Sequence, residues 1–239
     1  MGDFVFRHFR ILHGNSTMKV GTDAVLVGAL TKIHPSVRTI LDVGTGCGII
    51  ALMLAQRSNA EIVAIDIDKP SVEEATINFR NSPWPDRLTP VLAAFQHFSS
   101  TSEIRYDLIV SNHTFFQDCQ LPLRESLSIA KHNKRLNFEE LLQGAERLLN
   151  DDGSISLILP VNESKAFLEK AGDCSFFPNE IIEMVPIKGK PVNRILLTVK
   201  RKKSPNPLIQ TLTLRNNDGK FSDDYKMLTK DFHPPEYFY

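Results

Sequence analysis

Three glycines spaced two residues apart constrain the fold of this chain more than any other feature of its sequence. Residues 42–48 read Asp-Val-Gly-Thr-Gly-Cys-Gly, between a short run at 38–41 that predicts a buried strand and an apolar-rich helix start at 49–56. A strand, a glycine loop and a helix in this order open a nucleotide-binding α/β domain. Because side chains at the glycine positions would keep a ligand away from the backbone amides, the loop predicts a binding site. The alternative is a tight turn that binds nothing.

The composition limits the class of protein. The 239 residues suffice for one α/β domain with an appendage, and the net charge of +0 means that only a local basic face could attract a nucleic acid. The three cysteines have no paired or metal-like spacing, and no run of about 18 apolar residues occurs. With a polar, basic N-terminus that does not resemble a signal peptide, these features predict a cytoplasmic protein without a bound metal.

Hydrophobic periodicity predicts alternating strands and helices. Residues 4–11 alternate apolar with polar side chains and predict a half-exposed strand, and residues 24–30 predict a helix. Thr22 or Asp23 either caps that helix or leaves its first amides free to bind, together with Lys19, a carboxylate of the ligand. Further strands are expected at 60–66, 88–92, 106–112, 153–160, 180–186, 193–200 and 208–214, and helices at 70–80, 138–149 and 164–170.

Polar side chains end two of the predicted strands. Asp66 lies about 20 residues beyond the glycine loop, where an acid accepts hydrogen bonds from ribose hydroxyls in nucleotide-binding domains. Asp68 is expected to cap the next helix instead. Asn112 ends a later strand, and because the carboxyl ends of strands carry the chemistry of a doubly wound sheet, we expect its side chain to project into the site.

The spacing of the glycines, at i, i+2 and i+4, differs from that of dinucleotide-binding proteins and resembles that of S-adenosylmethionine-dependent methyltransferases. The segments Phe-Arg-His-Phe at 6–9 and Met-Lys-Val-Gly-Thr-Asp-Ala-Val-Leu at 18–26 resemble one bacterial family closely, the tRNA1(Val) (adenine-N6)-methyltransferases. So do residues 51–57, 81–84, 212–225 and 230–232, so that the resemblance covers nearly the whole chain. It implies an α/β, Rossmann-like class I methyltransferase domain with a doubly wound seven-stranded sheet at 35–239. An N-terminal extension at 1–34 would pack on the cofactor and substrate site.

The family's reaction is methylation of the exocyclic amine (N6) of adenosine 37, beside the anticodon of valine tRNA. This amine is a weak nucleophile because its lone pair is delocalised into the ring. Two acceptors that hold its protons can pull the nitrogen towards tetrahedral geometry. By resemblance, the Asn112 side chain and the His113 carbonyl are these acceptors, and Phe115 stacks on the extruded base.

The resemblance also assigns the binding residues. It places Asp42 near the methionine end of the cofactor, S-adenosyl-L-methionine. The cofactor-binding candidates are Lys19, Thr22, Asp23, Asp42, Gly44, Thr45, Gly46, Gly48, Asp66 and Ile67. The tRNA-binding candidates are the basic residues Arg7, Arg10, Lys131 and Arg135.

Two positions depart from the family pattern. Amino-methyltransferases carry Asn-Pro-Pro-Tyr or Asn-Pro-Pro-Phe after the fourth strand, whereas residues 112–115 read Asn-His-Thr-Phe. Each proline would restrict the backbone, so we expect weak or lost activity relative to a Pro-Pro version. Ala93-Ala94 stands where the family has Ala-Asp, whose acid accepts from the adenine amine, so weaker cofactor binding is expected. Phe95, the next residue, either packs against the adenine or belongs to the core.

Two other functions are compatible with the sequence. A degenerate homologue could bind cofactor or RNA without catalysis, as the altered motif at 112–115 suggests. A methyltransferase for a small-molecule or protein amine or amide would also use Asn112, and the neutral net charge does not exclude it. Competition by tRNA and the salt dependence of binding would separate these functions. Cys47, within the glycine loop, is expected to serve packing rather than reactivity.

Overall fold

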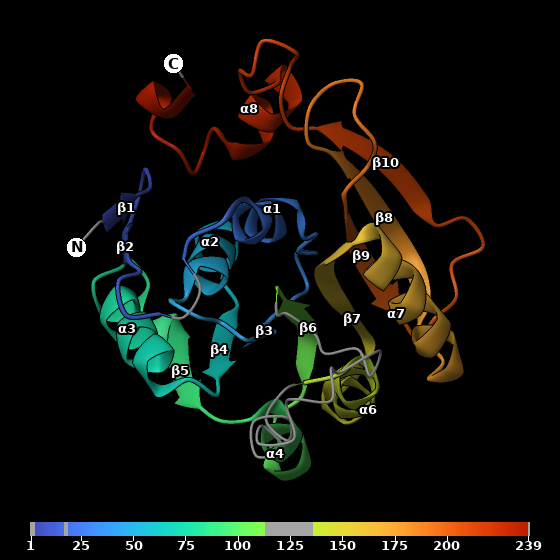
Figure 1. Ribbon diagram of the computed structural model, residues 1–239. Helices are drawn as coiled ribbons and strands as arrows, with labels where there is room; N and C mark the ends of the chain where they lie inside the picture. Colours follow the sequence, from blue (N-terminus) through green and yellow to red (C-terminus); the bar gives the residue numbers. More distant parts are fainter. Residues whose placement is uncertain (1–2, 17–18, 113–135, 239) are drawn as a thin grey trace, which may run out of the picture.

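A mixed sheet of eight strands forms the centre of the computed structural model, which describes residues 3–16, 19–112 and 136–238 (Figure 1). The strand order is β10-β8-β9-β7-β6-β3-β4-β5, and neighbouring strands are parallel except that β9 is antiparallel to both β7 and β8. The strands are β3 (Thr39–Val43), β4 (Glu61–Asp66), β5 (Leu88–Leu92), β6 (Tyr106–Ser111), β7 (Leu149–Pro160), β8 (Phe177–Val185), β9 (Arg194–Lys200) and β10 (Leu208–Thr213).

The sheet has one strand more than expected. Residues 208–213 do form the predicted strand, but β10 continues the sheet beyond β8, with Leu208 opposite Glu180 and Thr213 opposite Val185. The expected number of seven describes the doubly wound part from β5 to β8. The eighth strand is an edge strand with its first four residues exposed, and so it adds backbone pairing rather than core.

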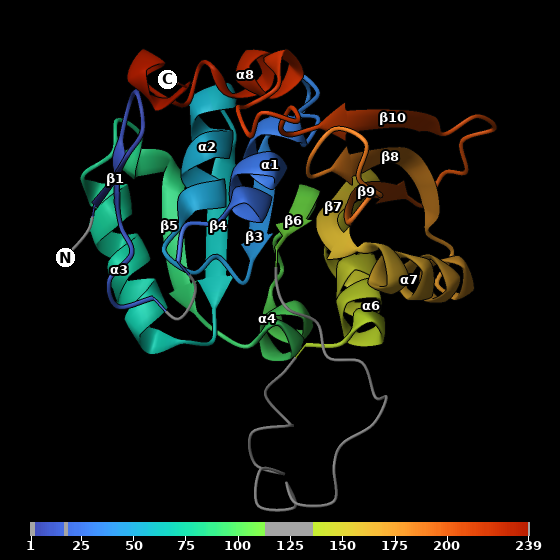
Figure 2. The same ribbon diagram turned by 45° about the horizontal axis from the view of Figure 1, so that its top comes forward.

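Helices cover both faces of the sheet (Figures 1 and 2). One core lies under α1 (Thr22–Leu30), α2 (Ile49–Arg57) and α3 (Lys69–Arg80). The second core lies under α4 (Phe95–Thr101), α6 (Phe138–Leu148) and α7 (Val161–Asp173). Consecutive residues of β3 alternate between the cores, with Ile40 in the first and Leu41 in the second. Burial on both faces therefore explains why the central strands read as continuous apolar runs.

The strand order reverses between β3 and β6. From β3 the chain moves outward to β4 and β5 and then returns to β6 on the other side of β3. In open α/β sheets, ligands bind in the crevice at the carboxyl ends of strands where the order reverses. The glycine loop that follows β3 and Asn112, which follows β6, therefore meet at this point.

The N-terminal strand predicted at 4–11 is wrong. The segment instead forms an antiparallel hairpin of β1 (Asp3–Val5) and β2 (Arg10–Leu12), with a turn closed by a 2.9 Å hydrogen bond from Phe6 N to Phe9 O. Phe6 and Phe9 are both buried, and their rings stack with centroids 4.6 Å apart. Turning the chain between them places both rings in the core, which a single strand over this segment would not achieve.

The hairpin packs against the end of the chain, which lies beside it in both views (Figures 1 and 2). Arg7 N donates a hydrogen bond to Phe232 O at 2.6 Å, and the ring of His233 stacks between Phe6 at 5.4 Å and Tyr237 at 3.7 Å. Burial lowers the pKa of His233 to about 4, so the ring is neutral in this apolar cluster. The two ends of the described chain are thus one packed unit.

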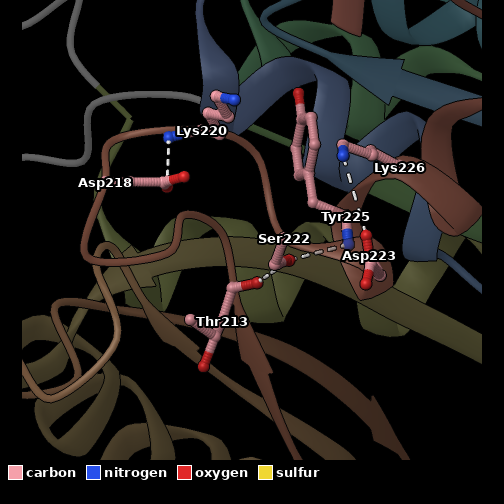
Figure 3. A network of polar contacts seen from close by, with 7 residues as sticks. All are labelled: Thr213, Asp218, Lys220, Ser222, Asp223, Tyr225 and Lys226. Carbon is pink, nitrogen blue, oxygen red and sulfur yellow. Dashed lines mark hydrogen bonds and ion pairs between the residues drawn. The ribbon is translucent and has the colours of Figure 1, made fainter.

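Helix α8 (Asp223–Thr229) leads into this unit and is followed by the 3₁₀ turn η2 (Pro235–Phe238), while another 3₁₀ turn, η1 (Pro85–Arg87), precedes β5. Ser222 caps α8: its hydroxyl accepts from Tyr225 N at 3.0 Å and donates to the carbonyl of Thr213 at the end of β10 (Figure 3). One side chain therefore starts the helix and ties it to the sheet.

None of the helices within the described ranges has the length and apolar character to cross a bilayer.

Candidate active site

A cavity of about 280 Å³ lies where the strand order reverses. It brings together seven of the predicted site residues: Lys19, Gly44, Thr45, Gly46, Asp66, Ile67 and Asn112. The remaining described residues of its lining are Ala24, Cys47, Ile49, Ile50, Asp68 and Ser71. The combination of an apolar wall, backbone amides and a carboxylate is typical of a small-molecule site.

The glycine loop is held rigidly by its own backbone. Gly44 N and Thr45 N both donate to Ile65 O, at 2.9 and 3.0 Å, which ties the loop to the end of β4. Gly44, Gly46 and Gly48 have φ angles of 74°, 56° and 88°, in the left-handed region that favours glycine. The conformation alone thus explains the three glycines.

Gly48 packs closely against the ring of Phe79. A Cβ at this position would meet Cε1 of Phe79 at 2.4 Å, and Gly48 is the N-cap residue of α2 outside the described lining of the cavity. Gly48 therefore packs closely against α3, and its expected contact with the cofactor stays a prediction. Gly44 and Gly46 do line the cavity, as predicted.

Asp66 presents a carboxylate at the cavity wall. It ends β4 and is half-buried, and its carboxylate accepts from Gly46 N and from Asp68 N, each at 2.9 Å. Each carboxylate oxygen can accept a further hydrogen bond, so these bonds orient Asp66 without using up its acceptors. Asp68 caps α3 through Ser71 N at 3.0 Å, which confirms the cap predicted for it.

Asp42 lies beneath the cavity rather than in it. The residue is fully buried, and its Oδ2 accepts from the Thr45 hydroxyl at 2.6 Å. Burial raises the pKa of Asp42 to about 7. Of the pair, Thr45 lines the cavity and Asp42 supports it from below; the place of Asp42 near the methionine end of the cofactor stays a prediction.

The start of α1 borders the cavity through Ala24. Neither predicted side-chain cap is present: the N-cap residue is Gly21, and Asp23 instead pairs with Arg194 at 2.9 Å. Thr22 is exposed and lies outside the described lining. Lys19 lines the cavity, where its ammonium is held by the carbonyls of His13 and Gly14, at 2.7 and 2.9 Å.

A second, smaller cavity of about 30 Å³ continues from the first. Gly44, Asp66 and Ile67 line both cavities, and Ala94 and Phe95 line the second. Phe95 is only 4% exposed. Its ring also fills the space beside Gly144, where a Cβ would meet it at 2.3 Å. The ring therefore belongs to the core and at the same time forms one wall of this cavity.

Asn112 follows β6 and lines the larger cavity, half-buried, as predicted. The strand end before it is fixed by a hydrogen bond from the Ser111 hydroxyl to Val43 O at 2.9 Å. The other predicted catalytic and tRNA-binding residues His113, Phe115, Lys131 and Arg135 lie outside the described residues.

Arg7 and Arg10 are not brought to the cavity. Arg7 lies beside Gln56 and Arg57, at the end of α2 remote from the glycine loop. Arg10 lines a separate depression on the hairpin with Asn78 and Asn81.

Cys47 is buried at the cavity wall, and burial raises the pKa of its thiol to about 12. The thiolate is therefore absent near neutral pH, and the expected packing role is confirmed. Across residues 3–16, 19–112 and 136–238, no three His, Cys, Asp or Glu side chains are grouped to hold a metal ion.

Sequence reasoning missed Ser71, Glu74 and Asn78 of α3. Ser71 lines the cavity, and Glu74 and Asn78 are buried behind it. Their positions, three and four residues apart, place them on one helix face together with the apolar Ala75 and Phe79. Polar residues on an otherwise apolar helix face were the signal that could have revealed them.

Comparison with known proteins shows that the chain is similar to methyltransferases over nearly its whole length. A family model described as a methyltransferase domain matches residues 35–196. The tRNA1(Val) (adenine(37)-N6)-methyltransferase of Bacteroides fragilis is 35% identical over 234 residues, 96% of this chain and 97% of that protein. The enzyme of the same name from Christiangramia forsetii is 38% identical over 233 residues, with the same coverage of 96% and 97%.

A crystal structure of a predicted O-methyltransferase from Agrobacterium tumefaciens has the same fold. Its TM-score is 0.64 at 17% identity, and the match covers 88% of this chain and 96% of the other. The full-length sequence matches then identify the family within this fold. The chain belongs to the tRNA1(Val) (adenine(37)-N6)-methyltransferase family.

Proposed function

We propose that this S-adenosylmethionine-dependent methyltransferase methylates N6 of adenosine 37 in the anticodon loop of valine tRNA. The observation that carries the proposal is that Asn112 and the glycine loop with Asp66 line one cavity. The names of the relatives at 35% and 38% identity supply the substrate. A tRNA substrate also implies a cytoplasmic place of action.

The described residues fit S-adenosyl-L-methionine. Asp66 retains acceptors for the two ribose hydroxyls, and Ile67, 41% exposed, offers an apolar surface on which an adenine can lie. Lys19 carries a positive charge into the cavity for the amino-acid carboxylate. The bound cofactor supplies the electrophilic methyl group.

In the proposed reaction, the chain positions the target amine rather than ionising it. The Asn112 side-chain oxygen accepts a hydrogen bond from one N–H of the amine and weakens delocalisation of the nitrogen lone pair. By family resemblance, the His113 carbonyl accepts a hydrogen bond from the other N–H and Phe115 stacks on the base. The amine loses its proton after attack, so no general base is required before it.

We further propose that two parts of the chain have different roles. Residues 1–34 would form an extension that completes the cofactor site through Lys19 and Ala24, and residues 35–239 the methyltransferase domain. Lys131 and Arg135 would bind tRNA phosphates beside the target base. Arg7 and Arg10 lie away from the cavity, so any phosphate they bind would belong to a more distant part of the tRNA.

Methyl transfer to unmodified tRNA transcripts tests the proposal. We expect labelled methyl transfer to valine tRNA, and none to the same transcript with guanosine at position 37. Asn112→Ala should lower kcat by at least about a hundredfold while the affinity for S-adenosylhomocysteine stays unchanged. Asn217→Ala, in an exposed turn, is the matched control.

Two other outcomes would contradict the proposal. If the wild-type protein binds S-adenosylhomocysteine but methylates no tRNA, the degenerate homologue is favoured. If the guanosine-37 transcript is methylated equally well, the target nucleotide is wrong.

A further inference from the structure

Two buried polar residues of α3 hold the N-terminal segment 12–16 beside the cofactor cavity. The Glu74 carboxylate accepts from two successive backbone amides, Asn15 N at 3.0 Å and Ser16 N at 2.9 Å. Asn78 accepts from Leu12 N at 2.9 Å and donates to Leu12 O at 2.8 Å. Glu74 and Asn78 are 4% and 2% exposed, so these bonds are made in the protein interior.

A chain of hydrogen bonds connects this segment to the cavity wall. The Ser71 hydroxyl lies 3.2 Å from the Ser16 hydroxyl and 2.6 Å from Oδ2 of Asp68. Asp68 N in turn donates to Asp66, whose other carboxylate oxygen holds Gly46 N. The segment held by Glu74 is therefore linked to the residues expected to bind the ribose.

Segment 12–16 also lies beside the glycine loop. A Cβ added to Gly46 would lie 3.5 Å from the Ser16 hydroxyl oxygen, so one methyl group would fill the space between them. Asn78 donates a further hydrogen bond, at 2.8 Å, to the carbonyl of Cys47 in the same loop. One helix thus fixes the N-terminal segment and the glycine loop relative to each other.

A polar side chain at position 74 indicates that this residue fixes the position of segment 12–16 rather than merely filling the core. An apolar side chain at position 74 would bury as much surface but would leave the amides of Asn15 and Ser16 without their acceptor. A buried carboxylate is costly unless donors surround it, so the segment must adopt one conformation for Glu74 to be tolerated. The carbonyls of His13 and Gly14, within this segment, are the ones that hold Lys19 at the cavity.

We propose that Glu74 and Asn78 are positioning residues for cofactor binding, acting through segment 12–16 on Lys19 and the glycine loop. The inference rests on the proposed use of the cavity by the cofactor, but not on the identity of the methyl acceptor. Neither residue is among the described lining of the cavity.

Glu74→Gln tests the proposal with little change of shape. The amide offers one acceptor oxygen and turns an N–H₂ group towards a backbone N–H, so one of the two bonds is lost. We expect the Kd for S-adenosylhomocysteine, measured by calorimetry, to rise about tenfold. Glu73→Gln is the matched control, because the Glu73 side chain is 64% exposed and pairs only with Lys69, at 3.6 Å, among the described residues.

Two further measurements separate positioning from general destabilisation. The KM for S-adenosylmethionine should rise in Glu74→Gln while the KM for tRNA changes less than twofold. Trypsin should cleave after Lys19 faster in Glu74→Gln than in the wild type. Saturation with S-adenosylhomocysteine should restore protection.

The outcomes are distinguishable. If the wild-type protein does not bind S-adenosylhomocysteine, the assignment of the cavity fails. If it binds and Glu74→Gln binds equally well, the positioning role is overturned. Should Glu74→Gln not fold, Ser16→Ala, which keeps the backbone bonds and removes the link to Ser71, is expected to raise the Kd about threefold; an unchanged Kd would refute the link.

Discussion

The buried carboxylate of Asp42 accepts a hydrogen bond from the Thr45 hydroxyl at 2.6 Å. Asp42 belongs to β3 and Thr45 to the cavity wall, so the bond ties the ligand site to the central sheet. The second carboxylate oxygen, Oδ1, has no hydrogen-bond partner in the described part of the chain. Burial accordingly raises the pKa of Asp42 to about 7.

This pair predicts a specific pH dependence of stability. An aspartate in the unfolded chain has a pKa of about 4, so between about pH 4 and 7 folding retains a proton that unfolding releases. The stabilisation by protonated Asp42 is therefore complete below pH 4 and is lost as the pH rises to 7. Relative to Asp42→Asn, the wild type should lose on the order of 2 kcal/mol of unfolding free energy between pH 5 and 8.

Urea unfolding of both proteins across this range is the measurement. All other titrating groups are shared by the two proteins, and their contributions cancel in the comparison. Parallel pH profiles would show that Asp42 is ionised in the folded protein.

Gly48→Ala should destabilise the protein for two reasons. A left-handed residue with a Cβ costs about 1–2 kcal/mol, and the clash with Phe79 adds about 1–3 kcal/mol of overpacking. Gly219→Ala is the matched control, because Gly219 has a similar φ of 81° and open space around its Cβ position. Chemical denaturation should therefore show a clearly larger loss for Gly48→Ala. Equal losses would mean that α3 shifts to accept the methyl group.

Ala94→Asp should raise both the stability of α4 and the affinity for the cofactor. Ala94 is the N-cap residue of α4, and an aspartate there can accept from the first helix amides, worth about 1 kcal/mol. Because Ala94 also lines the smaller cavity, the carboxylate can accept from the adenine amine, and we expect a several-fold lower Kd for S-adenosylhomocysteine.

Ala94→Ser separates the two effects of this change. A serine can cap the helix but brings no charge to the cavity, so stability should rise without a comparable gain in affinity. If Ala94→Asp stabilises the protein and leaves the Kd unchanged, the adenine does not occupy the smaller cavity.

The double variant His113→Pro, Thr114→Pro should methylate tRNA faster than the wild type. Each proline fixes its own φ and restricts the preceding residue, so the acceptors on Asn112 and on residue 113 would be better aligned. A misplacement of about 1 Å can cost roughly a hundredfold in rate. We therefore expect the rate constant of methyl transfer, measured in single-turnover assays, to be at least about tenfold higher. An unchanged kcat would show that the Asn-His-Thr-Phe form is already aligned.

Sequence reasoning succeeded where local pattern and strand topology decide the structure. The apolar runs around β3 and β4 predicted buried strands, and the rule for strand ends then brought Asp66 and Asn112 to one cavity. The cap at Asp68 is likewise local, because it joins residues three positions apart. Such features need no knowledge of distant contacts.

The missed features depend on contacts between distant segments. The alternation at 4–11 predicts one strand, whereas the chain turns there and the ring of Phe6 packs against His233. The sequence predicts Thr22 or Asp23 as the cap of α1, but Asp23 forms an ion pair with Arg194, which is distant in the sequence. Helices α4 and α8 were not predicted, because each buries only two of its seven residues and so shows little helical periodicity in the sequence.

The bond from Arg7 to Phe232 also bears on how the protein is made. A ribosome releases the hairpin long before it adds the tail, while β3 to β6 and α3 can assemble in order as they emerge. The ring of Phe6 stacks on His233 and therefore gains this partner only after the tail has been made. A nascent chain arrested before His233 would therefore leave the ring of Phe6 without this partner and accessible to chaperones.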